Sequence, residues 1–467
     1  MLVAEKNQFA YSRRIVWEHL ISHEREAMLH MGEDFKRYMK RAKTERETVI
    51  LTREIAENNG YKPVEKVLSP LKSGDRVYQV IKGKALIMAI IGERPLDEGV
   101  NIIGAHVDSP RLDLKVHPLY EHSGLALLKS HYYGGIKKYQ WLSLPLALHG
   151  VVIRNDGSKI DICLGEDDGD PVFTITDILP HLAKEQMDKK VTEAFPGESL
   201  NALCGSLPIE NNDIKERVKE SILGILNRQY GIIEEDFISA ELELVPAISP
   251  RDVGLDRSLV GAYGQDDRVC AYGLLMAMIG INRPINTSVG IFADKEEIGS
   301  VGNTGMQSNF FANFMAELLN KTTGQYNDLM LRRTMRFSRA LSADVNAAVD
   351  PGFEDVMEKN NAARLGCGPV VTKYTGSGGK KGANDAHAEF MARVRKIFND
   401  HHIIWQTGEL GKVDQGGGGT IAYMLANYGM DVVDCGIALL GMHSPFEISH
   451  KADIYMMYKG YKAFLDL

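Results

Sequence analysis

The sequence is poor in cysteine, and the few that it has exclude two kinds of structure. There are five cysteines in 467 residues, and no two of them have the Cys-x-x-Cys spacing of a thiolate metal site. They are Cys163, Cys204, Cys270, Cys367 and Cys435. An odd, scattered set is also unlike the paired framework of a small disulfide-rich secreted domain. We therefore expect a protein of a reducing compartment.

Long hydrophobic runs and an excess of positive charge are missing as well. The longest apolar stretches, 85–91 and 142–153, are too short to span a bilayer, and the first 20 residues contain no apolar signal segment. The formal net charge is −8, with 54 Lys and Arg against 62 Asp and Glu, so no basic surface for nucleic acid or anionic lipid is indicated. We expect a cytoplasmic protein that binds neither nucleic acid nor membrane.

The chain contains instead two kinds of secondary-structure pattern, which predict two folding units. Two amphipathic helices are indicated over 16–60, and from about residue 256 onward helical and strand-like segments alternate. Such alternation is typical of an α/β layer with a mostly parallel sheet. Residues 116–250 hold short alternating strands and turn signals instead. We therefore predict an α/β domain of residues 1–115 and 251–467, with helices flanking the sheet, and an inserted β-rich domain of residues 116–250.

Acidic and imidazole side chains stand near the carboxyl ends of four predicted strands and before one predicted helix of the α/β part. The residues are His106, Asp266, Glu296, Glu297, Asp344 and His443. The carboxyl ends of parallel strands meet at one edge of a sheet, and ligands bind at that edge in open α/β folds. We therefore expect these six side chains to lie close together.

The composition of this set suits zinc or another divalent transition metal, because imidazole nitrogens and carboxylate oxygens are the usual ligands of such ions. Five of the six are enough for a two-ion site with one bridging carboxylate, which leaves the sixth as a general base. Each residue also has a structural interpretation: His106 as a core histidine, Glu296-Glu297 as a solvated turn, and Asp266 as a helix cap. The residues alone leave both interpretations open.

Five segments of the sequence resemble the M18 metallo-aminopeptidases, a family that includes aspartyl aminopeptidase. The segments are GAHVDSPRLDLK (104–115), GQDDRVCAYGLL (264–275), ADKEEIGSVGNTG (293–305), LSADVNAAVDP (341–351) and GMHSPFEISHKADI (441–454). The resemblance extends over almost the whole chain. It implies a hydrolase that releases N-terminal amino acids from peptides with a free N-terminus.

The matching positions imply a role for each candidate residue. His106 and Asp344 would bind one ion. Glu297 and His443 would bind the other, with Asp266 bridging the two.

The resemblance also implies how the reaction proceeds. Glu296 would act as general base for a hydroxide shared by the ions, and Asp108 would orient His106 through its second ring nitrogen. Two divalent ions per subunit are implied, with zinc first and with cobalt and manganese suited to the same ligands.

An assembly is implied as well. Members of the family pair through the inserted domain, and the pairs form a tetrahedral dodecamer. His181, in the segment PHLA (180–183), matches a family segment in which a histidine reaches the active site of a neighbouring subunit. The alternative, a histidine at an ordinary subunit contact, stays open.

The preferred N-terminal residue is not fixed by the sequence. Aspartyl aminopeptidases place a basic residue just after a Gly-Pro-Val segment, and here Lys373 follows residues 368–370 closely, with Lys380 and Lys381 nearby. Selection of acidic residues is therefore one hypothesis.

Two further hypotheses concern the activity itself. One is a di-metal carboxypeptidase or amide deacylase of the same clan, and the other is a non-catalytic, metal-binding oligomeric scaffold. The glycine runs 375–384 and 414–420 match no phosphate-binding loop, so no nucleotide cofactor is expected.

Overall fold

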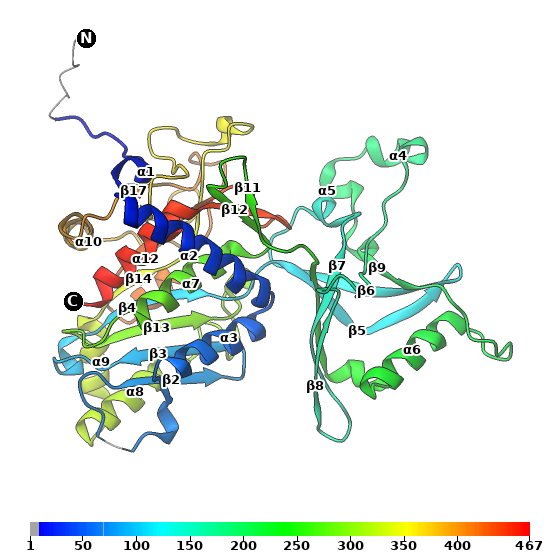
Figure 1. The fold of residues 1–467 in the computed structure, drawn as a ribbon, viewed down its shortest axis with the longest axis horizontal. Helices are drawn as coiled ribbons and strands as arrows, with labels where there is room; N and C mark the ends of the chain where they lie inside the picture. Colours follow the sequence, from blue (N-terminus) through cyan, green and yellow to red (C-terminus); the bar gives the residue numbers. More distant parts are fainter. Residues whose placement is uncertain (1–8, 69) are drawn as a thin grey trace, which may run out of the picture.

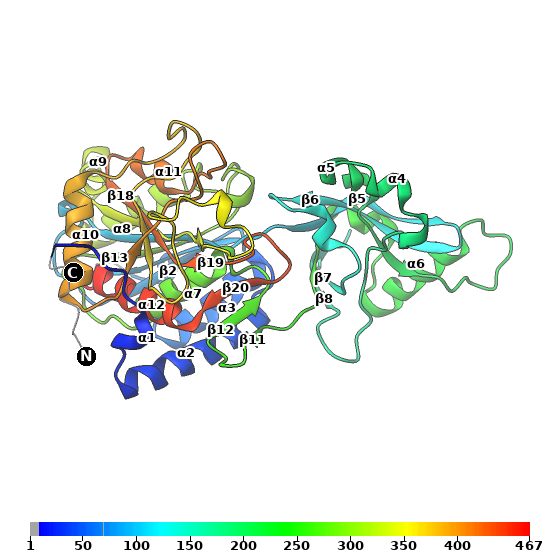
Figure 2. The same ribbon diagram turned by 90° about the horizontal axis from the view of Figure 1, so that it is seen from above.

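The computed structural model describes residues 9–68 and 70–467, which form a larger and a smaller lobe (Figure 1). A nine-stranded sheet lies at the centre of the larger lobe with helices on both of its faces, and a six-stranded sheet is the core of the smaller lobe (Figure 2). Within the described residues, no helix is both long and apolar enough to cross a membrane.

The strands of the large sheet run mostly in one direction. In spatial order they are β1 (Lys62–Pro63), β2 (Arg76–Ile81), β3 (Ala85–Ile90), β13 (Ser288–Ala293), β4 (Asn101–His106), β14 (Arg339–Ser342), β18 (Asp431–Gly436), β16 (Val370–Thr372) and β17 (Gln406–Thr407). The four neighbours β13, β4, β14 and β18 are parallel, whereas β3 and β16 are antiparallel to the adjacent β13 and β18. The predicted mostly parallel sheet is confirmed.

Two layers of helices cover this sheet and bury its central strands. One layer is α2 (Ser22–Arg41), α3 (Glu45–Asn58), α7 (Gln265–Ile279), α10 (Ala388–Asp400) and α12 (Lys451–Leu465), and the other is α8 (Phe310–Thr323), α9 (Asp328–Phe337) and α11 (Ala422–Ala426). Every residue of β4 is buried; Ile103 packs against the first layer and Ile102 against the second. A strand buried on both faces has a continuous apolar sequence, which is why the sequence predicted β4.

The amphipathic region 16–60 forms three helices instead of the expected two. A short α1 (Val16–His19) precedes α2 and α3. A capping box separates α2 from α3: the Thr44 hydroxyl accepts the N–H of Glu47 at 3.2 Å, and the Glu47 carboxylate accepts the N–H of Thr44 at 3.1 Å. These two bonds satisfy N–H groups that a helix start otherwise leaves unpaired.

The smaller lobe is built on an antiparallel sheet. In spatial order its strands are β8 (Lys159–Leu164), β7 (Leu146–Ile153), β10 (Ala240–Pro246), β5 (Arg111–His122), β6 (Leu125–Tyr133) and β9 (Asn201–Gly205). The helix α6 (Arg217–Tyr230) packs on β5 and β6, and two short helices, α4 (Lys184–Met187) and α5 (Val191–Ala194), lie near the end of the lobe. Because β5 crosses the predicted boundary at residue 115, the domain limits stay a prediction.

Two small sheets lie at the edge of the large sheet. The first contains β11 (Arg251–Val253), β12 (Leu259–Ala262) and β20 (Glu447–His450), and the second pairs β15 (Asn346–Ala347) with β19 (Ala438–Leu439). The chain runs from β12 into α7 and from β19 into β20. Both turns lie at the carboxyl edge of the large sheet, where they bring in further polar residues.

Candidate metal centre

The six candidate residues meet at the carboxyl edge of the large sheet. His106 is the last residue of β4, Asp344 follows β14 by two residues, and His443 lies between β19 and β20. Glu296 and Glu297 open a single 3-10 turn, η7 (Glu296–Ile298), just beyond β13, and Asp266 lies at the start of α7. The structure therefore brings together residues that are up to 337 positions apart (443 − 106).

Asp266 lies between two imidazole rings. Its Oδ1 atom is 3.2 Å from Nε2 of His106, and its Oδ2 atom is 3.1 Å from Nε2 of His443. The backbone of Asp266 is not helical, although it belongs to the first turn of α7. Each carboxylate oxygen thus faces a different ring, as in a carboxylate that bridges two ions.

Three further carboxylates surround the same two rings. Nε2 of His106 is 3.9 Å from Oε2 of Glu296 and 3.9 Å from Oδ1 of Asp344. Nε2 of His443 is 3.5 Å from Oε1 of Glu297, a buried oxygen without a hydrogen-bond partner among the described residues. A buried acceptor of this kind is costly unless a cation or donor meets it, and the nitrogen and oxygen donors suit zinc. The donor set therefore fits a metal ion, although equal distances do not separate the roles of Glu296 and Asp344.

The carboxyl groups of the cluster crowd one another in a buried space. Burial raises the pKa of Glu296 to about 7 and holds the pKa of Glu297 and of Asp344 well above its usual value, and neighbouring carboxylates add to these effects. Burial lowers the pKa of His443, but its hydrogen bond to Asp266 and the negative charges of Asp266, Glu297 and Glu447 together outweigh this and raise the pKa to about 10. Several acids thus compete for little positive charge, which a divalent cation would supply.

Asp108 anchors both His106 and the turn that carries the two glutamates. Nδ1 of His106 lies 3.0 Å from the main-chain oxygen of Asp108 and 3.3 Å from its Oδ1 atom, so Nε2 is left to face the cluster. The fully buried carboxylate accepts the N–H groups of Glu296 at 3.1 Å and Glu297 at 3.2 Å, and the hydroxyl of Tyr133 at 2.8 Å. Asp108 therefore does more than orient a ring, because it also fixes the backbone of η7.

Two further buried acids, Glu447 and Asp267, have a similar role, and the sequence analysis missed Glu447. The carboxylate of Glu447, in β20, accepts the N–H of His443 at 2.7 Å and the N–H of Asp266 at 3.0 Å. Burial raises the pKa of Glu447 to about 8. The carboxylate of Asp267 accepts the N–H of His106 at 3.2 Å. Both acids bind main-chain N–H groups; Glu447 does so from a distant strand, so no side-chain pattern in the sequence indicates it.

His181 lies apart from the cluster. It is exposed in a short 3-10 turn, η4 (Pro180–Leu182), of the smaller lobe. It does not line the cavity that lies beside the six clustered residues of its own chain. Its predicted contact with a neighbouring subunit stays a prediction.

A cavity of about 420 Å³ opens beside the cluster. Besides the clustered residues, its walls are Gly299, Ser300, Val345, Asn346, Thr375, Leu410, Gly417, Gly418, Gly419, Thr420, Tyr423, Met424 and Met442. None of the described residues that line it is a lysine or arginine. The walls beyond the six clustered residues are therefore apolar or neutral.

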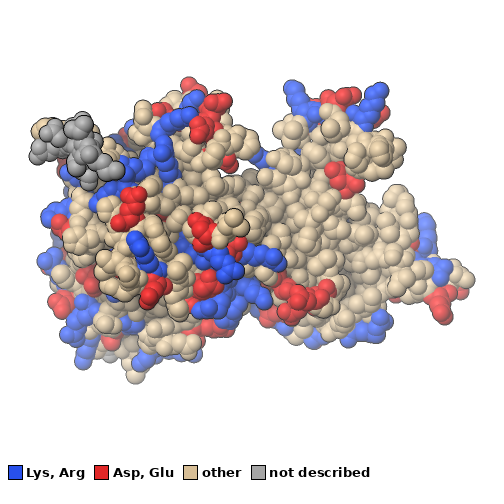
Figure 3. All heavy atoms as spheres, turned by 45° about the horizontal axis from the view of Figure 1, so that its top comes forward, with Lys and Arg blue, Asp and Glu red and all other residues tan. Residues whose placement is uncertain are grey.

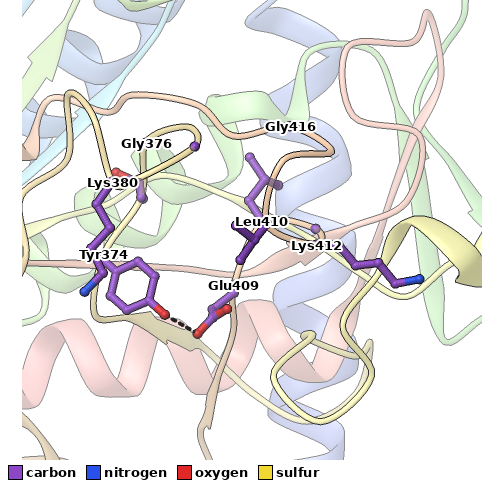
Figure 4. A pocket seen from close by; sticks show the side chains of 11 residues that line it. Tyr374, Gly376, Lys380, Glu409, Leu410, Lys412 and Gly416 are labelled. Carbon is purple, nitrogen blue, oxygen red and sulfur yellow. Dashed lines mark hydrogen bonds between the residues drawn. The ribbon is translucent and has the colours of Figure 1, made fainter.

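The lysines expected to select acidic substrates lie elsewhere. Nζ of Lys373 and Nζ of Lys380 are 2.7 Å and 2.8 Å from the two oxygens of Asp385. Lys380 also lines a neighbouring smaller pocket, where its Nζ lies 3.7 Å from the ring centre of Tyr374, whose hydroxyl donates to Glu409 (Figure 4). Both lysines thus share Asp385 as an ion-pair partner.

An open α/β sheet with buried imidazoles and carboxylates around a shared aspartate at its carboxyl edge is the architecture of a metal-dependent hydrolase. Residues 38–465 match the sequence profile of the family described as Aminopeptidase I zinc metalloprotease (M18). The chain belongs to the M18 family and is a metal-dependent aminopeptidase.

Individual relatives agree with this. The chain is 54% identical over 439 residues to the probable M18 family aminopeptidase 1 of Clostridium acetobutylicum. The aligned region covers 93% of this chain and 94% of that protein. The crystal structure of the M18 aminopeptidase of Thermotoga maritima has a TM-score of 0.94 at 48% identity and covers 98% of this chain and 100% of that one. The S. cerevisiae mApe1 dodecamer has a TM-score of 0.74 at 20% identity, covers 93% and 96%, and shares the fold. The predicted family, fold class and activity are confirmed.

Proposed function

We propose that the chain removes N-terminal amino acids from peptides at a centre that holds two divalent ions. The observation that carries this proposal is the placement of Asp266, whose two oxygens lie 3.2 Å and 3.1 Å from Nε2 of His106 and Nε2 of His443. Asp344 completes the ligands on the His106 side, and Glu297 completes them on the His443 side. Zinc is the ion named by the family description, and cobalt and manganese accept the same donors.

The protein's own groups handle the proton and the ring orientation. When bound, the ions lower the pKa of a water molecule and polarise the scissile carbonyl. Glu296 lines the same cavity; it takes a proton from the attacking water and passes it to the leaving amine, as in the family pattern. The main-chain oxygen of Asp108 accepts Nδ1–H of His106, so that the lone pair of Nε2 points into the centre.

The reaction is tested by comparing substrates with free and blocked α-amines. Hydrolysis of aminoacyl anilides only when the amine is free, lost on chelation and restored with about two zinc, cobalt or manganese ions per chain, supports the proposal. Cleavage of N-acylated amino acids supports the carboxypeptidase or deacylase hypothesis instead. Metal binding without hydrolysis of either substrate supports the scaffold hypothesis.

For the N-terminal residue of the substrate, we propose a preference for neutral side chains over acidic ones. The described walls of the cavity beside the cluster contain no lysine or arginine, and Lys373 and Lys380 are paired with Asp385. An acidic side chain would enter this cavity without a partner for its charge, which is costly. A panel of Leu, Ala, Asp and Glu anilides should give a kcat/KM at least about 10-fold higher for the neutral pair. Equal or higher values for Asp and Glu would restore the acidic hypothesis.

We propose that the smaller lobe is the main contact between subunits of a homo-oligomer. Several large apolar side chains of the lobe are exposed within residues 172–191: Val172, Ile178, Leu179, Leu182, Met187 and Val191. Figure 3 shows a broad face of this lobe with few charged side chains. Exposed apolar patches of this kind mark protein interfaces. The related mApe1 is a dodecamer, and we propose the same assembly here, with His181 in the contact segment.

A further inference from the structure

A short segment of the smaller lobe reaches the metal centre of the larger lobe. It is residues 133–135, at the end of β6. The hydroxyl of Tyr133 donates to Oδ2 of Asp108 at 2.8 Å, and the main-chain oxygen of Gly135 accepts Nδ1–H of His443 at 2.8 Å. Gly134 packs directly on Glu297, since a Cβ atom at this glycine would lie 3.3 Å from the Oε2 atom of that residue. Three consecutive residues thus touch three different parts of the centre.

The hydroxyl of Tyr133 acts through Asp108. One oxygen of the Asp108 carboxylate accepts the N–H of Glu296, and the other accepts the N–H of Glu297 together with the Tyr133 hydroxyl. The hydroxyl therefore helps to set the orientation of the carboxylate that fixes both glutamates. A change of this orientation would shift the ligand Glu297 and the base Glu296 together.

The carbonyl of Gly135 acts on the other side of the centre. Because it accepts the Nδ1–H of His443, it favours the tautomer in which Nε2 carries the lone pair. That Nε2 atom is the one that lies 3.1 Å from Asp266. Partners of the remote ring nitrogen orient metal-binding histidines and raise their basicity.

Tyr133 itself is held by the junction of the two lobes. The guanidinium of Arg111 lies 3.9 Å from the ring centre of Tyr133. The two residues are directly opposite each other in the pairing of β5 with β6. Arg111 is buried and contacts Glu45 of α3 and Glu243 of β10, each at 3.2 Å. The position of the tyrosine hydroxyl therefore depends on how the smaller lobe is seated on the larger one.

We propose that residues 133–135 are a positioning element of the metal centre, so that the smaller lobe sets metal affinity and turnover in addition to any role in assembly. The inference rests on the proposed two-ion centre. Its alternative is that the end of β6 merely packs against the larger lobe, in which case loss of one hydroxyl leaves metal binding unchanged.

The first test is Tyr133→Phe, which keeps the ring and removes the hydroxyl. Removal of such an indirect partner typically weakens metal binding or activity about 10–100-fold. We expect the zinc Kd, measured by chelator competition, to rise or kcat to fall by this factor. KM should stay within about twofold of the native value. The melting temperature of the metal-free protein should stay near native. Tyr132→Phe is the matched control, because Tyr132 is 42% exposed and stacks on His131.

The second test is Gly134→Ala, which presses a methyl group against Glu297. Gly134 has φ +73°, so alanine also strains the backbone there. Gly124→Ala is the control, since Gly124 has φ +74° in the β5–β6 turn but nothing within 4 Å of an added Cβ atom. We expect both variants to lose similar stability when metal-free, while only Gly134→Ala loses metal affinity, by about 10-fold or more.

The outcomes separate this inference from the proposed function. If Tyr133→Phe and Gly134→Ala bind zinc and turn over like their controls while the native protein holds two ions and needs a free α-amine, the positioning element is wrong and the function stands. If the native protein itself holds fewer than two ions, the proposed function fails, and with it this inference.

Discussion

Oδ1 of Asp108 accepts the main-chain N–H of Glu296 at 3.1 Å, whereas the Glu296 side chain forms no hydrogen bond with the described residues and lies 3.9 Å from Nε2 of His106. The Glu296 carboxylate can therefore exchange protons without loosening the turn that carries it. A substitution limited to the end of this side chain separates the chemistry from the architecture.

Glu296→Gln is such a substitution. We expect kcat to fall by about 10²–10⁴-fold, because the amide cannot accept a proton from water. Elemental analysis should still find about two metal ions per chain. A loss of metal in this variant would reassign Glu296 as a ligand and leave Asp344 as the candidate base.

His443→Ala tests the second ion. Nε2 of His443 lies 3.5 Å from Oε1 of Glu297 and 3.1 Å from Oδ2 of Asp266, so its removal should leave this side of the centre short of a ligand. Elemental analysis after dialysis should show bound metal falling from two ions toward one. His117→Ala, an exposed histidine of β5, should change nothing. Full occupancy in the His443 variant would contradict its assignment as a ligand.

Arg111→Met tests the charge network at the junction of the lobes. The buried guanidinium balances Glu45 and Glu243, which would be left without their shared partner. Breaking a buried ion pair in this way costs on the order of 3–5 kcal/mol of unfolding free energy. Urea denaturation of the metal-free protein measures the loss. Arg41→Met breaks an exposed pair with Glu54 and should cost about 1 kcal/mol or less.

His149 predicts a pH dependence of stability at the same junction. Burial lowers its pKa, but hydrogen bonds to Cys163, Glu166 and Glu47 outweigh this and raise the pKa to about 11. Because this pKa is higher in the folded than in the unfolded state, protonation of His149 stabilises the fold. The stabilisation is complete below the ordinary pKa of 6.5 and is lost as the pH rises toward 11. Unfolding free energies of the metal-free protein should therefore fall more steeply between these pH values in the native chain than in His149→Gln. Parallel curves would exclude a charged His149.

Leu182→Asp tests the proposed subunit contact. Leu182 is 68% exposed in the apolar segment of the smaller lobe, so a carboxylate there should disrupt a contact that buries it. Light scattering should show a smaller particle than the native protein. Leu255→Asp, in the exposed turn between β11 and β12, is the control. An unchanged particle mass would place the interface elsewhere.

The sequence predicted several strand ends well because an apolar run stops there at a polar candidate: His106 is the last residue of β4, and Glu296 and Asp344 follow the ends of β13 and β14 within three residues. It did not predict Glu447 or Tyr133, since Glu447 binds main-chain N–H groups and Tyr133 acts through Asp108, from distant strands. Arg111 had no role in the sequence analysis either, because its partners Glu45 and Glu243 are brought to it only by folding. The cytoplasmic location and the role of His181 stay predictions.

The spread of the candidate metal ligands along the chain has a consequence for how the site is assembled. The sheet places His106 first, but β14 and β18 must join β4 before Asp344 and His443 can approach it. A chain cut before residue 443 would therefore hold Glu296, the candidate base, without a complete set of candidate ligands, and we expect such a fragment to bind less metal and to be inactive.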